Sequence, residues 1–151
     1  MGLGKFVFPR SSRIRSFSAV TVRHEDNRRL LVGQSILRSH SVHGNSYTPD
    51  GWFGQKIGRT GVQQPVEDTA FIERFEYDFC LERNGEPGLS VVGPFCDPDW
   101  TADRVAHAIA EDYFHPILSH ELVVTVEGPS SELVVSADSI VDVVKTVSPA
   151  Q

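Results

Sequence analysis

The stretch RSFSAVTVRHEDNRRLLVGQSIL, residues 15–37, decides the fold class of this chain. Within residues 15–23, Phe17, Ala19 and Thr21 alternate with Ser16, Ser18, Val20 and Val22, so the two sets would lie on opposite faces of a strand. The β-branched side chains in this segment also favour a strand. Residues 24–27 are polar and typical of a turn, and residues 28–37 return to apolar side chains. Two such runs joined by a short polar turn predict an antiparallel β-hairpin.

Further elements are expected on both sides of this hairpin. We predict helices over residues 5–13, 67–76, 99–117 and 138–147, and strands over residues 89–95, 121–127 and 132–135. The strand at 89–95 is nearly all apolar, which indicates the middle of a covered sheet. The order of the elements predicts an α+β fold: a mixed, mainly antiparallel sheet layered with helices on one face.

Some side chains are expected in the core. Residues 40–65 are rich in Gly, Ser, Asn, Asp and Pro and predict a long irregular loop, in which Trp52 and Phe53 anchor against the core. The helical spacing predicts two apolar helix faces. These faces consist of Ala70, Phe71 and Phe75 in one helix, and of Val105, Ile109, Tyr113 and Ile117 in the other, with Phe114 also expected in the core.

Composition limits the class of protein. The chain has 151 residues, of which 40% are hydrophobic and 23% charged, enough for one domain with a real core. No apolar run approaches the roughly 18–20 residues that span a bilayer, and the N-terminal residues lack the apolar region of a secretory signal, so we expect a soluble, cytoplasmic protein. Two cysteines, Cys80 and Cys96, provide neither a disulfide framework nor a four-thiolate zinc site, and are expected to be buried.

Charge is distributed unevenly along the chain. Residues 1–38 hold eight Lys and Arg against two Asp and Glu, whereas the remainder holds six against eighteen. A basic segment on an acidic body indicates an anionic partner, either nucleic acid or the phosphates of a nucleotide. Attraction between the two segments within the fold explains the same pattern equally well.

Few residues carry recognisable chemistry. In Gly2-Leu3-Gly4-Lys5 the glycines let backbone amides approach an anion and Lys5 adds a positive charge, although a flexible terminus leading into a helix has the same composition. His40 and His43 have metal-ligand spacing but are expected to be exposed loop residues, because no third ligand is evident. We therefore assign no metal ligand and no catalytic residue.

An ordered set of motifs adds to this picture. The segments are GLGKFVFPRSSRIRSFSAVTVR, LLVGQSILRSH, GWFG, EPGLSVVGPF and a helix ending in DYFHPIL. Together they resemble the C-terminal part of a GHKL-type (gyrase, heat-shock chaperone, histidine kinase, MutL) ATPase domain, as found in bacterial chaperone-like ATPases. The resemblance covers residues 1–127 and implies a partial α/β sandwich, with residues 128–151 beginning a following segment.

The resemblance implies a site for ATP with Mg²⁺. Gly2, Gly4 and Lys5 would be the lid positions that embrace the triphosphate. Gly88 would be the glycine of the family's Gly-Thr element, which opens a central strand below the nucleotide, although Leu89 replaces the threonine.

The same resemblance implies an incomplete site. The family's helix with a catalytic acid and a magnesium-binding Asn, and its adenine-reading Asp-x-Gly-x-Gly element, have no counterpart in the sequence. We therefore expect this chain alone not to hydrolyse ATP, since phosphoryl transfer depends on those groups for positioning and charge stabilisation.

Two other functions fit the sequence. One is a non-enzymatic protein-interaction module whose incomplete sheet pairs with another chain or with a second copy. The other is nucleic-acid binding through the basic N-terminal region, with aromatic stacking. The residues for the second are Arg10, Arg13, Arg15, Arg28 and Arg29, interleaved with Phe6, Phe8 and Phe17.

Overall fold

The structure is a computed structural model that describes residues 7–58, 61–83 and 85–147, and it confirms the predicted α+β class with antiparallel sheets. The chain divides into two compact units, Met1–Asp97 and Pro98–Gln151, which we call unit 1 and unit 2. The resemblance places the end of the family domain after residue 127. That position lies within unit 2, in the turn that joins β9 (Val124–Glu127) to β10 (Glu132–Val135).

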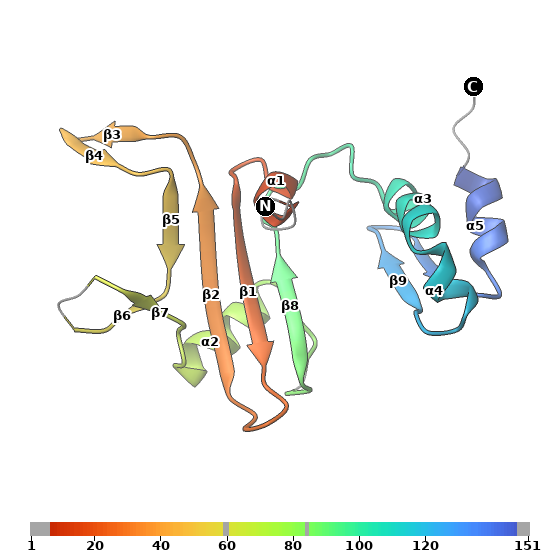
Figure 1. The fold of residues 1–151 in the computed structure, drawn as a ribbon, viewed down its shortest axis with the longest axis horizontal. Helices are drawn as coiled ribbons and strands as arrows, with labels where there is room; N and C mark the ends of the chain where they lie inside the picture. Colours follow the sequence, from red (N-terminus) through yellow and green to blue (C-terminus); the bar gives the residue numbers. More distant parts are fainter. Residues whose placement is uncertain (1–6, 59–60, 84, 148–151) are drawn as a thin grey trace. The chain divides into compact units, whose positions relative to one another are not determined.

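The centre of unit 1 is a four-stranded antiparallel sheet in the order β5-β2-β1-β8 (Figure 1). The strands are β1 (Ser16–Val22), β2 (Arg29–Ile36), β5 (Asp50–Phe53) and β8 (Gly88–Val92). The β1–β2 hairpin confirms the prediction from residues 15–37. Its turn contains Asn27 with φ of 53°, a left-handed conformation that asparagine tolerates better than most residues.

Helix α2 (Thr69–Asp78) covers one face of this sheet. Asp68 caps the helix, since its side chain accepts a hydrogen bond from Phe71 N at 2.8 Å. The fully buried core consists of Ile72 from the helix with Val20 and Leu31 from paired strand positions. The prediction of which residues this helix buries was wrong. Ile72 is the buried residue, whereas Ala70 and Phe71 of the predicted apolar face are exposed.

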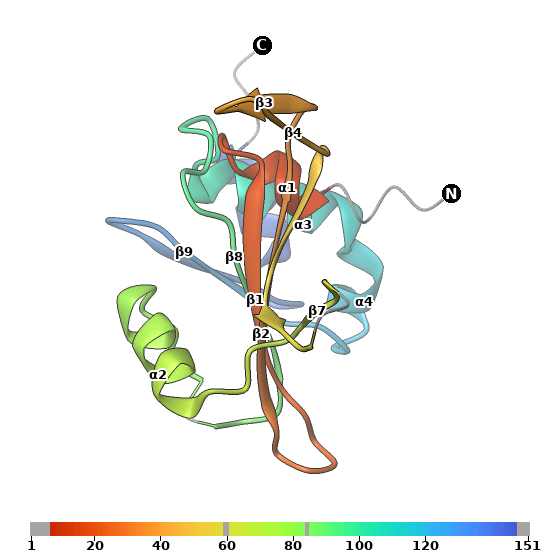
Figure 2. The same cartoon turned by 90° about the vertical axis from the view of Figure 1, so that its left-hand side faces the viewer.

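The opposite face of the sheet is apolar but open. Strand register aligns Val91, Ala19 and Val32 in one row and Leu89, Thr21 and Leu30 in the next, and none of these side chains is buried. Of the described elements of unit 1, α1 (Val7–Ser11) lies on this side, since the rings of Phe8 and Phe17 are 5.5 Å apart and Phe17 points away from the α2 core. Figure 2 views the sheet edge-on, with α2 on one side.

The prediction of an irregular loop at 40–65 was wrong. Besides β5, this region forms the small hairpins β3–β4 and β6–β7. Their strands are β3 (His40–Val42), β4 (Asn45–Tyr47), β6 (Gln55–Lys56) and β7 (Gln63–Gln64). Trp52 and Phe53 do not anchor in the core, because β5 is an edge strand and leaves them 59% and 48% exposed.

Strand β8 also differs from its prediction. It ends at Val92 and lies at the edge of the described sheet, beside β1, so the middle position expected for residues 89–95 was wrong. The expected burial of Cys80 and Cys96 was wrong too, since both follow the ends of elements and are exposed.

Unit 2 packs three helices with a β-hairpin. It contains α3 (Ala102–Asp112), α4 (Phe114–Leu118), the hairpin β9–β10 and α5 (Ile140–Val147). The buried core consists of Ala106, Ala110, Ile117, Val126, Val135, Ile140 and Val143.

Helix α3 buries other residues than those of its predicted apolar face. Thr101 caps the helix by accepting from Arg104 N at 3.3 Å, and Ala106 and Ala110 are the residues that it buries. Tyr113 and Phe114 are each 53% exposed, so their predicted place in the core was wrong. Alanine fits the buried positions because α3 packs directly on α5 and on the hairpin.

None of the helices in the described ranges is long and apolar enough to cross a membrane.

Candidate functional site

Three of the four residues that the resemblance assigns to nucleotide binding, Gly2, Gly4 and Lys5, lie outside the described residues. The fourth, Gly88, begins β8 and is paired with Val22 of β1. Its φ of 145° is rarely adopted by residues with a side chain. Gly88 O also accepts a hydrogen bond from Thr21 Oγ1 at 3.1 Å, so its peptide group is fixed to the sheet.

The side chain of Arg83 packs against Gly88, whose positive φ already favours glycine. Its Nε donates to Ser90 Oγ at 2.9 Å and its Nη2 to Leu89 O at 2.8 Å. A Cβ atom built on Gly88 would collide with the same guanidinium group. Sequence reasoning missed Arg83, because nothing in the spacing of residues 83–90 reveals that the arginine folds back against β8.

A polar hollow lies where α1 ends and β1 begins, with a volume of about 550 Å³. We call it the arginine hollow. Its lining consists of Arg10, Ser11, Ser12, Arg13, Arg15 and Asp97. Five of these six residues belong to the basic N-terminal segment, so the hollow concentrates the charge that the sequence analysis singled out.

Backbone contacts hold the arginine hollow in place. Arg13 N donates to Phe95 O at 2.9 Å, and the buried Ser12 donates from its Oγ to Pro94 O at 2.6 Å. Arg15 has a left-handed φ of 56°, and its carbonyl accepts from Ile36 N at 2.9 Å. The segment that carries the arginines is therefore held by the residues that follow β8 and by the end of β2.

Three other arginines of the basic segment, Arg23, Arg28 and Arg29, have carboxylate partners. Arg28 forms an ion pair with Glu67, and Arg29 bridges Glu73 and Glu76 of α2. Arg23 pairs with Glu25 at 3.0 Å and with Asp26 at 3.3 Å. The predicted basic cluster therefore divides into two parts. Arg28 and Arg29 are paired with carboxylates, whereas Arg10, Arg13 and Arg15 line the arginine hollow.

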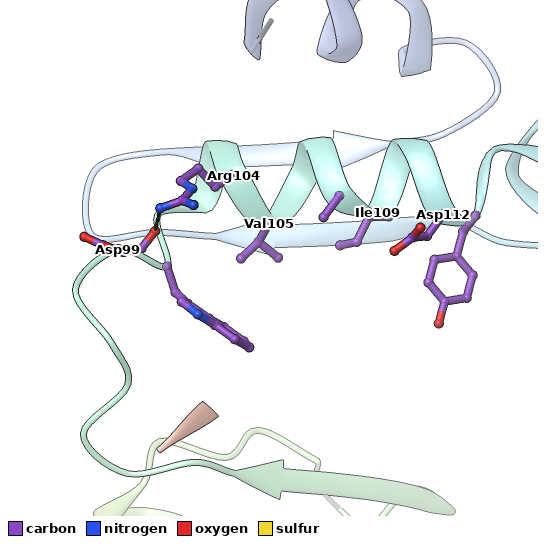
Figure 3. A pocket seen from close by; sticks show the side chains of 8 residues that line it. Asp99, Arg104, Val105, Ile109 and Asp112 are labelled. Carbon is purple, nitrogen blue, oxygen red and sulfur yellow. Dashed lines mark hydrogen bonds between the residues drawn. The ribbon is translucent and has the colours of Figure 1, made fainter. Parts of the chain in front are cut away.

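Unit 2 contains an apolar groove of about 360 Å³ along α3. Figure 3 shows Val105 and Ile109 on this side of the helix, with Asp99 near one end and Asp112 near the other. Trp100, Arg104, Ala108 and Tyr113 complete the lining. Arg104 Nη1 donates to Asp99 O at 3.0 Å, which ties the rim of the groove to the start of the helix. The groove offers mainly apolar contact, with charged side chains at its two ends.

The histidines of the small hairpin carry no metal cluster. His40 stacks on Tyr47 with ring centroids 5.4 Å apart, and His43 lies in the turn with φ of 50°. Within residues 7–58, 61–83 and 85–147, no three His, Cys, Asp or Glu side chains are grouped as metal ligands.

Comparisons of this chain with protein families, with curated proteins and with solved structures found no match.

Proposed function

We propose that this chain contributes the phosphate lid and the sheet floor of a GHKL-like ATP-binding domain, and does not hydrolyse ATP by itself. The observation that carries the proposal is the position of α1 on the open face of the unit 1 sheet, opposite α2. Residues 2–5 precede α1 in the sequence, with Phe6 between them. An arrangement of this kind leaves one face of the sheet for a nucleotide and for the protein layer that covers it.

The order of the elements supports the same proposal. Helix α1 is followed by the β1–β2 hairpin, and β8, which opens with Gly88, pairs antiparallel with β1. In the proposed site, the amides of Gly2 and Gly4 bind phosphate oxygens and Lys5 neutralises their charge, with Mg²⁺ accompanying the ATP. No Asp or Glu precedes Glu25, so the proposed lid supplies no general base for water.

Calorimetric titration of Mg-ATP tests the proposal. The titration uses the chain and a form extended by whatever coding sequence directly precedes Met1, each with and without Lys5→Ala. We expect the extended form to bind, and Lys5→Ala to weaken binding about tenfold through loss of a charged phosphate contact. Phosphate release by the chain alone should stay at the buffer rate.

Lys56→Ala is the matched control, because Lys56 is an exposed lysine of the same unit, on β6. It should leave Mg-ATP binding unchanged. The proposal fails if neither form binds Mg-ATP, or if Lys56→Ala weakens binding as much as Lys5→Ala does.

A second candidate function is protein interaction through self-association. The open face of the sheet favours it, because Leu89 and Trp52 are 58% and 59% exposed on strands that also form the edges of the described sheet. Exposed apolar side chains beside unpaired strand edges are typical of surfaces that pair with another chain. In this case a second copy would cover the face, and nucleotide would play no part.

Sedimentation equilibrium distinguishes this candidate from the first. Self-association should appear as an average mass that rises with protein concentration in the absence of nucleotide. Leu89→Glu should weaken the association tenfold or more, which corresponds roughly to the free energy of burying one leucine side chain. Tyr77→Glu is the control, since Tyr77 is 78% exposed on α2, which covers the other face. A monomer at all concentrations contradicts self-association.

A further inference from the structure

We infer that the arginine hollow binds a compact phosphate-bearing anion, either free pyrophosphate or the phosphates of a nucleotide, through residues other than those of the lid segment 2–5. The inference goes beyond the proposed ATP lid and does not depend on it. It rests on residues at the C-terminal end of α1, all of which the structure describes.

The first argument is an excess of positive charge. Among the described residues, no carboxylate oxygen lies within 4.0 Å of the guanidinium groups of Arg10, Arg13 or Arg15, whereas Arg28 and Arg29 both have ion-pair partners. Three like charges around one hollow repel one another, and a bound anion removes that repulsion.

The second argument is fixed geometry. The hydroxyl of Ser11 donates to Phe8 O at 2.7 Å, and that of Ser12 donates to Pro94 O, so both serines hold the backbone of this segment. Arg15 N donates to Ser12 O at 2.9 Å, which closes the turn between α1 and β1. The segment that carries the arginines is thus ordered before a ligand arrives, which lowers the entropic cost of binding.

The third argument is the match between arginine and phosphate. A guanidinium group offers paired donors that fit two oxygens of one phosphate group, and several of them together select ligands with more than one negative charge. Asp97 also lines the hollow, and its negative charge opposes an anion. Asp97 therefore limits the affinity, and Asp97→Asn should tighten binding.

A compact ligand fits this surface better than a nucleic acid. A nucleic-acid backbone requires a track of positive charge, whereas Arg23, Arg28 and Arg29 lie at the other end of β1 and are neutralised by carboxylates. Three of the remaining arginines line one hollow of about 550 Å³, which accommodates a few phosphate groups.

Calorimetry on the full chain tests the inference, with inorganic pyrophosphate, ADP and a short single-stranded oligonucleotide as separate probes. We expect Arg10→Gln and Arg13→Gln each to weaken pyrophosphate binding about tenfold, the usual effect of one charged hydrogen bond. Arg13→Lys keeps the positive charge but loses the paired donors, so its affinity for pyrophosphate should lie between those of Arg13→Gln and the unmodified chain. Arg38→Gln is the control, an exposed arginine of the same unit outside the hollow.

The outcomes separate this site from the lid. Loss of pyrophosphate binding in the hollow variants, with normal binding in Lys5→Ala and Arg38→Gln, supports the inference even if the ATP proposal fails. Tighter binding of ADP than of pyrophosphate identifies a nucleotide as the source of the phosphates, and the reverse identifies the free anion.

Three results overturn the inference. They are unchanged binding in both hollow variants, an equal loss in Arg38→Gln, and an oligonucleotide that binds more tightly than pyrophosphate through the same arginines. Circular dichroism confirms that each variant is folded, and substitution of exposed arginines should leave the melting temperature unchanged within about 2 °C.

Discussion

Gly88 and Arg83 form a contact that depends on the absence of a side chain. The backbone of Gly88 is left-handed, and the guanidinium of Arg83 occupies the space next to its Cα while donating to Ser90 and Leu89. The resemblance accounts for a glycine here through nucleotide binding, and the contact with Arg83 accounts for it through packing. The two explanations predict different results for the same substitutions.

Gly88→Ala should lower the free energy of unfolding by about 1–3 kcal/mol, because alanine is strained at this φ and its Cβ displaces Arg83. Urea unfolding followed by circular dichroism measures the change. Gly44→Ala is the matched control, since Gly44 also has a positive φ of 81° but open space around it. If both substitutions cost the same, backbone strain alone explains Gly88, and Arg83 contributes nothing.

At the scale of elements, local signals were sufficient for the β1–β2 hairpin, and they indicated the start of α3 to within three residues, since the predicted helix began at residue 99 and α3 begins at Ala102. The alternation of residues 15–37 and the cap at Thr101 both depend on neighbours in sequence, so they are visible without the fold. The hairpin β3–β4 was missed because its strands have three residues each and its turn at Gly44 has the composition of a loop.

The buried faces of the helices were less predictable than the helices themselves. Helical spacing selects a stripe of large apolar residues, yet the surface against which a helix packs decides which of them are buried. In α3 the close approach of α5 and the β9–β10 hairpin selects Ala106 and Ala110, and Tyr113 is left exposed beyond the end of the helix. The ion pairs of Arg28 with Glu67 and of Arg29 with Glu76 join residues far apart in sequence, so counting charges along the sequence could not distinguish these arginines from those of the arginine hollow.

At the scale of the whole molecule, the described residues form two hydrophobic cores and not the single core expected from chain length. One contains Val20, Leu31 and Ile72, the other contains Ile117 and its neighbours, and no residue belongs to both. The division follows the boundary between Asp97 and Pro98. Each unit therefore depends on its own buried side chains for stability.

Ile72→Ala and Ile117→Ala should each destabilise one unit by about 2–5 kcal/mol, because both isoleucines are fully buried. Hydrogen exchange measured by mass spectrometry should show faster exchange in β1 and β2 for Ile72→Ala, and in α3 and β9 for Ile117→Ala. If either substitution accelerates exchange to the same extent in both units, the two cores unfold as one.

The edges of the unit 1 sheet are bordered by prolines, and this restricts how far the sheet can grow. Pro49 directly precedes β5, Pro87 directly precedes β8, and Pro94 follows β8 by two residues. Proline has no amide hydrogen to donate, so an incoming strand finds a ladder of only four or five residues before the pairing stops. Such short, interrupted edges oppose stacking into fibrils, and any assembly that the sheet forms should remain small and soluble at high concentration.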